Sequence, residues 1–289
     1  MRGAMTSSTR VQAEPFHLTL PIGARGPFVF ASPHSGGVYP ADLGAAAGLS
    51  RASLRSAEDA LVDRLISAGP DHGAALIAGR LSRAYVDLNR DPAELDPVLI
   101  EDCPGAEVTA KVAAGFGVIP RRTGDGATLY DRRLTLAESR SRLEAVHAPY
   151  HTALAGLMQD AHRRLGVAIL IDWHSMPSRA AGGQGRTTRG PDVILGDRHG
   201  AACRARLTRR LRALFEGAGW RVGLNRPYAG GYSTQLWGRP DEGFQAVQIE
   251  LNRALYLDEK TLEPSGDFTR CEAVLDRVIG AVCAEDWAA

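Results

Sequence analysis

Residues Val167–Pro177 read V-A-I-L-I-D-W-H-S-M-P, an apolar run that ends in Asp172, His174 and Ser175. A run this apolar and this short, lying between helical patterns, predicts a buried strand of an α/β sheet. Ligands of open α/β sheets bind beyond the carboxyl ends of the strands, which is where these polar side chains fall. The segment therefore predicts the fold class and the position of a site.

Two further segments repeat this pattern of an apolar run joined to a polar side chain. Residues 27–36 read P-F-V-F-A-S-P-H-S-G and end near His34. Residues 245–253 read Q-A-V-Q-I-E-L-N-R and place Glu250 among apolar neighbours. Two histidines and a carboxylate that come from three strand-like segments form a group that zinc chemistry can use.

Strand and helix patterns alternate along most of the chain, which predicts a three-layer α/β/α domain. Further strands are predicted at His17–Leu20, Phe28–Ala31, Ala74–Ala78, Ala84–Leu88, Asp192–Leu195 and Trp220–Leu224. Helices are predicted at Ser53–Ser67, Leu134–Leu165 with a break near Pro149, His199–Glu216 and Thr269–Ala284. We expect a single domain over residues 15–289, preceded by a flexible segment at residues 1–14.

The composition excludes several classes of partner. The 34 basic and 33 acidic residues give a net charge of +1, so neither nucleic acid nor an anionic membrane is expected as a partner. The four cysteines are scattered and form no CxxC pair, which is typical of reduced thiols. The N-terminal residues lack the apolar core of a signal peptide, and no window approaches the ~20 apolar residues of a membrane span. We therefore expect a cytoplasmic protein.

The histidines at the two strand ends are the first candidate metal ligands. Asp172 lies two residues before His174, on the same face of a strand, and could accept the second ring N–H of a metal-bound imidazole. A structural Asp–His pair is the alternative. A catalytic zinc usually has three protein ligands, and Asp59 or Glu58 in S-A-E-D-A-L-V-D could supply the third. The chain contains no HExxH motif, so spacing alone leaves this ligand open.

Glu250 is the candidate general base. An ionisable side chain between Ile249 and Leu251 is costly to bury unless it is paired or functional. Desolvation raises the pKa of a carboxylate and a neighbouring dication lowers it, a balance that suits a base working near neutral pH. A buried salt bridge, with Arg253 as one possible partner, is the structural alternative.

The segment Y-V-D-L-N-R-D-P, residues 85–92, places Asn89 and Arg90 at another predicted strand end. The guanidinium fork of Arg90 could bind a substrate carboxylate in a bidentate manner. A surface ion pair with Asp87 or Asp91 explains the same segment equally well.

Two glycine-rich segments are candidates for flexible loops near the site. Residues 230–234, G-G-Y-S-T, carry Tyr232 as a possible hydrogen-bond donor to a ligand, and Tyr228 precedes them. Residues 180–191, A-A-G-G-Q-G-R-T-T-R-G-P, directly follow the strand with Asp172 and His174 and could form a mobile active-site loop.

The ordered set of motifs resembles the N-formylglutamate amidohydrolase family. The motifs that carry the resemblance run from about Phe28 to Glu259: S-P-H-S-G, E-D-x-x-V-D-R-L, Y-V-D-L-N-R-D-P-x-E-L-D-P, I-D-W-H-S-M, A-G-G-Y-S-T and Q-I-E-L-N-R-A-L-Y. The family looks like a relative of the zinc carboxypeptidases and aspartoacylases. The resemblance implies a mixed, mostly parallel, eight-stranded central sheet flanked by helices.

The same resemblance implies an activity and a set of residues that carry it. One zinc ion per chain would be held by His34, Asp59 and His174, with Asp59 favoured over Glu58. The expected activity is hydrolysis of an N-acyl amino acid, N-formyl-L-glutamate giving formate and L-glutamate. The remaining implied roles are Glu250 as general base and Asn89 and Arg90 as the pair that holds the substrate carboxylate. Apart from the resemblance, we expect Tyr232 to bind the substrate and Asp172 to orient His174. A peptidase or cell-wall amidase on the same zinc scaffold, and a binding protein that has lost turnover, are the alternative functions.

Overall fold

The structure is a computed structural model that describes residues 14–103, 108–182 and 190–287. Most of the predicted flexible segment 1–14 and the central part of the glycine-rich loop 180–191 lie outside these residues. No helix among the described residues has the length and apolar character needed to cross a membrane.

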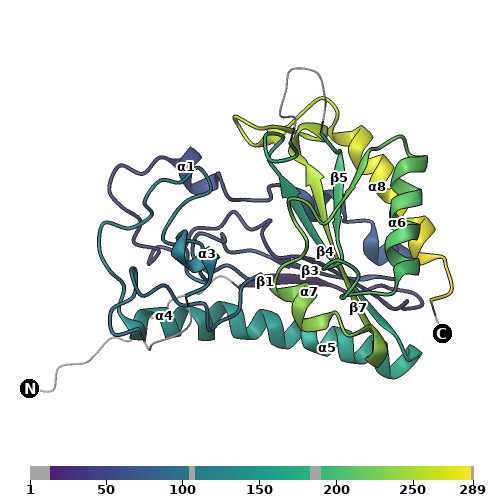
Figure 1. Ribbon diagram of the computed structural model, residues 1–289, viewed down its shortest axis with the longest axis horizontal. Helices are drawn as coiled ribbons and strands as arrows, with labels where there is room; N and C mark the ends of the chain where they lie inside the picture. The colour runs from purple at the N-terminus through teal and green to yellow at the C-terminus, as the bar shows by residue number, and fades with distance from the viewer. Residues whose placement is uncertain (1–13, 104–107, 183–189, 288–289) are drawn as a thin grey trace, which may run out of the picture.

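A seven-stranded sheet in the order β1-β3-β2-β4-β7-β5-β6 forms the centre of the molecule (Figure 1). Its strands are β1 Phe16–Thr19, β2 Phe28–Ser32, β3 Ala75–Gly79, β4 Ala168–Met176, β5 Val193–Gly196, β6 Val222–Leu224 and β7 Phe244–Asn252. β3, β2, β4 and β7 run parallel to one another, whereas β1 is antiparallel to β3 and β5 is antiparallel to β7. The predicted mixed, mostly parallel sheet is confirmed.

The implied count of eight strands differs from the seven in the described main sheet. A separate two-stranded sheet pairs β8 (Leu257–Asp258) with β9 (Glu263–Pro264). The predicted strand at Ala84–Leu88 is wrong, because this segment consists of turns and irregular backbone. Its apolar side chains are buried against the loops around Val118, and the Asp87 N–H donates to the Val118 carbonyl. The apolar pattern of residues 84–88 therefore reflects burial of an irregular segment and not a strand.

The central strands are buried on both faces, which explains their continuous apolar runs. Successive residues alternate between two hydrophobic cores: Phe28 and Phe30 belong to one, and Val29 and Ala31 belong to the other. α6 (Ala205–Gly217) and α8 (Phe268–Cys283) cover the first face, and α5 (Ala148–Leu165) runs along the second (Figure 1). The predicted three-layer α/β/α arrangement is confirmed.

The longest helical pattern, predicted at Leu134–Leu165, forms a continuous helical stretch of three parts. α4 (Leu136–Arg142) begins with a Thr135–Glu138 capping box, a π-helical turn follows at Leu143–His147, and α5 continues from there. Pro149 lies in the first turn of α5. The predicted break near Pro149 is therefore absent. The helix continues through a wider π-helical turn just before the proline.

The predicted helix Ser53–Ser67 is wrong as a single element. It is divided into α1 (Arg51–Arg55) and α2 (Val62–Leu65), with Leu61 between them at a φ of +64°. The Asp59 N–H donates to the carbonyl of His34, and this contact draws the connecting residues toward the end of β2. Tertiary bonding of the connector therefore overrides the local helical spacing.

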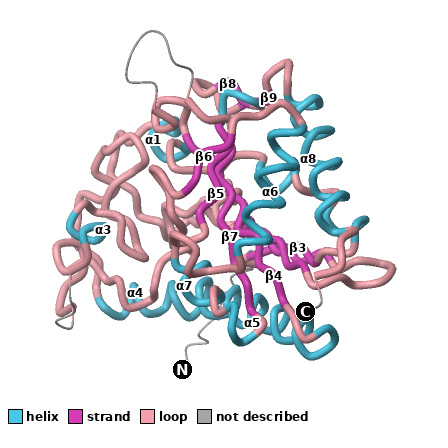
Figure 2. The backbone as a smooth tube through the Cα atoms, turned by 45° about the vertical axis from the view of Figure 1, so that its right-hand side comes forward, coloured by secondary structure: helices cyan, strands magenta, loops and turns pink. Residues whose placement is uncertain are grey.

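The remaining helices are short and lie mainly in the loops that surround the sheet (Figure 2). They are α3 (Ala110–Ala113), α7 (Tyr232–Trp237) and the 3₁₀ turns Gly69–His72, Pro240–Glu242 and Arg253–Leu255. Much of residues 91–103 and 108–133 is irregular.

Candidate active site

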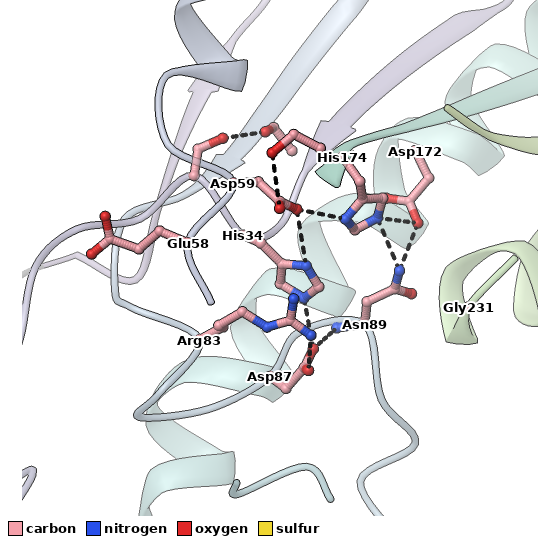
Figure 3. A network of polar contacts seen from close by, with 12 residues as sticks. His34, Glu58, Asp59, Arg83, Asp87, Asn89, Asp172, His174 and Gly231 are labelled. Carbon is pink, nitrogen blue, oxygen red and sulfur yellow. Dashed lines mark hydrogen bonds and ion pairs between the residues drawn. The ribbon is translucent and has the colours of Figure 1, made fainter. Parts of the chain in front are cut away.

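Three separate segments bring His34, Asp59 and His174 together in a buried cluster (Figure 3). His34 follows β2, His174 lies near the end of the neighbouring strand β4, and Asp59 lies in the connector between α1 and α2. Their candidate ligand atoms all lie within 4.8 Å of one another. Asp59 Oδ2 is 3.0 Å from His174 Nδ1 and 3.4 Å from His34 Nδ1.

A second carboxylate lies against the other ring nitrogen of each histidine. Asp87 Oδ1 is 2.7 Å from His34 Nε2, and Asp172 Oδ2 is 3.0 Å from His174 Nε2. Both rings are therefore oriented with Nδ1 toward Asp59. The predicted Asp172–His174 contact is present in the structure. Sequence reasoning did not assign Asp87 to His34, although an acidic residue between Val86 and Leu88 carries the same signal as Glu250 does.

The two adjacent acids of the α1–α2 connector have different environments. Asp59 points into the cluster, and its Oδ1 atom accepts hydrogen bonds from Ser175 and from the guanidinium of Arg253, each at 3.2 Å. Glu58 points away from the histidines (Figure 3), where its carboxylate accepts hydrogen bonds from Tyr39 and Arg55. The geometry therefore brings Asp59, and not Glu58, to the two histidines.

The buried charges of the cluster stabilise one another strongly. Burial acts to raise the pKa of Asp59, but its hydrogen bond with His174 and the close approach of the His34 ring hold that pKa well below its usual range. Burial acts to lower the pKa of His174, yet the charges of Asp172 and Asp59 and their hydrogen bonds raise it well above its usual value. The carboxylates of the cluster thus favour a positive charge between them. A bound metal ion would supply such a charge.

The residues present fit a zinc ion. Two imidazoles and one carboxylate are a ligand set typical of catalytic zinc, which keeps a fourth position for water or substrate. His34 Nδ1 is buried and has no hydrogen-bond partner among the described residues, although it faces Asp59. Such an unpartnered nitrogen is costly in a protein interior, and coordination to a metal would satisfy it.

Glu250 lies beside the cluster on β7, where it is paired in register with His174 of β4. It is 5% exposed, and burial raises the pKa of its carboxyl group to about 7. Gln248 Nε2 donates to Glu250 Oε1 at 2.7 Å, whereas Arg253 is engaged by Asp59 and Ser175. The salt bridge between Glu250 and Arg253, the structural alternative for this carboxylate, is therefore not formed. A carboxyl group of this kind can exchange protons near neutral pH.

Asn89 links the cluster to the glycine loop that precedes α7. Its amide nitrogen lies 2.9 Å from Asp172 Oδ2, and its amide oxygen accepts the Ser233 N–H at 2.8 Å. Gly231 packs so closely that a Cβ there would lie 2.6 Å from Asn89 Nδ2. The Gly231 N–H also donates to Gln248 Oε1 at 2.7 Å. Asn89 and Gln248 therefore anchor the loop, and both ends of the Asn89 amide already have partners.

A cavity of about 410 Å³ opens over the cluster, and its size suits a small-molecule ligand. Arg90 lines it, and the closest carboxylate atoms to its guanidinium are Asp87 Oδ2 at 3.9 Å and Glu94 Oε2 at 4.0 Å. Tyr228 also lines this cavity. The ring of Tyr232 instead packs against His147 and His151 of the long helical stretch, with centroid distances of 6.0 and 5.3 Å.

The architecture and the cluster define an α/β protein with a buried histidine–aspartate–histidine group suited to a divalent metal, placed where ligands of such sheets bind. The sequence model of the N-formylglutamate amidohydrolase family matches residues 26–257. The chain therefore belongs to the N-formylglutamate amidohydrolase family.

Individual relatives agree with this assignment. An N-formylglutamate deformylase of Pseudomonas aeruginosa is 33% identical over 242 residues, which cover 82% of this chain and 84% of that protein. A protein of the same name from Pseudomonas putida is 30% identical over 68% of this chain and 70% of its own length. The crystal structure of N-formylglutamate amidohydrolase from Ralstonia eutropha has a TM-score of 0.88 and 34% identity, covering 94% of this chain and 98% of that chain.

Proposed function

We propose that this protein is a zinc-dependent amidohydrolase that converts N-formyl-L-glutamate and water into formate and L-glutamate. One observation carries the proposal: a buried His34–Asp59–His174 cluster lies beside Glu250 under a cavity of small-molecule size. The names of the Pseudomonas and Ralstonia relatives support the choice of substrate.

His34, Asp59 and His174 would hold the zinc ion. A zinc ion in this position supplies Lewis-acid chemistry, which lowers the pKa of water toward ~7 and polarises an acyl carbonyl. Asp87 and Asp172 keep both imidazole rings oriented with Nδ1 toward Asp59. Arg253 and Ser175 hold the Oδ1 atom of Asp59, so its Oδ2 atom remains directed at the histidines.

Glu250 moves the proton. Its carboxylate removes a proton from the attacking water as the new carbon–oxygen bond forms at the formyl carbon. The same group then donates that proton to the amine nitrogen as the carbon–nitrogen bond breaks, which releases formate and the free amino acid. Burial raises the pKa of Glu250 to about 7 and Gln248 fixes one of its oxygens, so both protonation states are accessible at neutral pH.

Arg90 is the proposed contact for the substrate carboxylate. Its guanidinium lines the cavity, and its two carboxylate neighbours lie near the limit of an ion pair, which leaves donors for a ligand. Asn89 lies beside it, and a substrate contact would come in addition to the bonds that its amide already makes. Tyr232 remains a predicted substrate contact that would require a change in its packing on α5.

Zinc content and formate release test the metal and the base separately. Alanine variants of His34, His174 and Asp59 should lose most bound zinc, whereas Glu58→Ala should keep it. Glu250→Gln should keep zinc while kcat falls about 10²-fold or more, the usual contribution of a positioned base. Full zinc occupancy in the His34, His174 or Asp59 variant would contradict the ligand assignment.

The substrate is tested with a panel of N-acyl amino acids and short peptides supplied to the zinc-loaded wild-type protein. We expect the fastest release of amine from N-formyl-L-glutamate. Faster cleavage of peptides would favour the peptidase alternative, and no hydrolysis of any member would contradict the proposed activity.

A further inference from the structure

One wall of the cavity is formed by α3 and the irregular segment that follows it. Lys111, Phe116 and Arg122 from this stretch line the cavity, together with Pro120, Thr123 and Gly124. None of these residues belongs to the His34–Asp59–His174 cluster or to the loop that holds Asn89. The wall is therefore built from residues other than those proposed to hold the metal.

The cavity carries more positive than negative side chains. Six cationic residues line it, against the three carboxylates of Asp59, Asp87 and Glu250. The cationic residues are Arg83, Arg90, Lys111, Arg122, Arg179 and Arg253. Arg253 is bonded to Asp59, and Arg83 donates to Asp87 at 2.6 Å. The remaining cations of the lining are Arg90, Lys111, Arg122 and Arg179.

Lys111 and Arg122 have no acidic partner within the part of the chain that the structure describes. No ion pair or hydrogen bond connects the Lys111 ammonium to another described side chain, and Arg122 donates to the backbone carbonyl of Gly126 at 2.8 Å. Desolvation, followed by repulsion from Arg90 and Arg83, lowers the pKa of Lys111. An anion bound at this wall would relieve that repulsion.

We propose that Lys111 and Arg122 form a subsite for the second carboxylate of an N-acyl dicarboxylic amino acid, while Arg90 holds the first. This inference rests on the proposed function and assigns the side-chain selectivity of the same site. Phe116 supplies an apolar surface for the methylene groups that separate the two carboxylates. Neutral and cationic N-acyl amino acids would leave the two cations of the wall without a partner, so they are disfavoured.

Lys111 allows a closely matched experiment, because the chain has only one other lysine, the exposed Lys260. Formate release is measured for wild type, Lys111→Met, Arg122→Gln and the control Lys260→Met with N-formyl-L-glutamate and its neutral isostere N-formyl-L-glutamine. Loss of a charge-assisted contact should lower kcat/KM for the glutamate substrate about 10- to 100-fold in Lys111→Met. The glutamine substrate should change by less than about 3-fold, and Lys111→Arg should restore most of the loss.

Equal losses on the two substrates, or a wild-type protein that hydrolyses both equally well, would overturn the subsite. Equilibrium binding of both compounds is also measured with zinc-loaded Glu250→Gln and with the double variant that adds Lys111→Met. This measurement tests the subsite independently of whether the proposed hydrolysis occurs. If the wild type hydrolyses neither compound, the proposed function fails. A Lys111-dependent preference in binding for N-formyl-L-glutamate would still support the subsite, and equal binding of the two compounds would overturn it.

Discussion

His151 should make the folded protein sensitive to acid. It lies on α5, where its Nε2 atom is 2.9 Å from the carbonyl oxygen of Leu88 and donates to it. Its Nδ1 atom is buried and has no hydrogen-bond partner among the described residues. Burial, with a further contribution from His147, lowers the pKa of His151 from 6.5 to about 4. A second proton would therefore place an unsatisfied charge beneath the segment that carries Asn89 and Arg90.

The sign and size of the effect follow from this shift. Between about pH 6.5 and 4 the unfolded chain binds the proton more readily than the folded chain, so stability falls as the pH is lowered through that window. One unit of pKa corresponds to about 1.36 kcal/mol, so lowering the pH from about 8 to about 4.5 should cost about 2.5 kcal/mol through His151 alone.

The assay is urea unfolding of the metal-stripped protein at these two pH values. His151→Gln keeps a donor near the Leu88 carbonyl but cannot be protonated, so its loss of stability should be about 2.5 kcal/mol smaller than that of wild type. The control is His17→Gln, because His17 is exposed on the edge strand β1. Equal losses in wild type and His151→Gln, after correction by this control, would refute the reasoning.

Two further predictions concern the support of the site. Asp87→Asn should weaken zinc binding about 10- to 100-fold in a chelator competition, because the carboxylate partner of His34 Nε2 is lost. The control Glu58→Gln should leave the zinc affinity unchanged. Equal zinc affinities of the two variants would contradict the role of Asp87. Gly231→Ala should lower the free energy of unfolding by about 1–3 kcal/mol and reduce formate release, since its Cβ would lie 2.6 Å from Asn89 Nδ2. Gly156→Ala, where a Cβ meets nothing within 4 Å, is the matched control and should be neutral or stabilising.

The strands that carry the cluster could be predicted from the sequence because they are buried on both faces. Each forms a short continuous apolar run, so its end is marked by the first polar residues, as at His34 and His174. The parallel order of β2, β4 and β7 then places these ends side by side. Glu250 could be identified for the same reason, since a lone carboxylate in an apolar strand is conspicuous.

The connector that supplies Asp59 could not be predicted in the same way. Apolar residues at helical spacing favour one helix across Ser53–Ser67, and nothing in that spacing marks a break. The break depends on a contact between segments far apart in the sequence, the hydrogen bond from the Asp59 N–H to the carbonyl of His34. Propensity describes a segment alone, whereas this geometry is determined by its neighbour.

The role of Asp87 could be found from its residue type, although the predicted strand around it is wrong. The apolar pattern around it predicts a strand, but the segment is an irregular loop. The carbonyl oxygens of Leu88 and Arg90 in this loop lie 2.9 Å from the Nε2 atoms of His151 and His147, respectively. These contacts hold Asp87 against His34 without any regular backbone pattern. A carboxylate buried between apolar residues needs a partner in any backbone conformation. Asp87 is therefore expected to have a partner even where the predicted secondary structure is wrong. That rule concerns the cost of burying a charge, and this cost does not depend on whether the backbone is a strand or a loop.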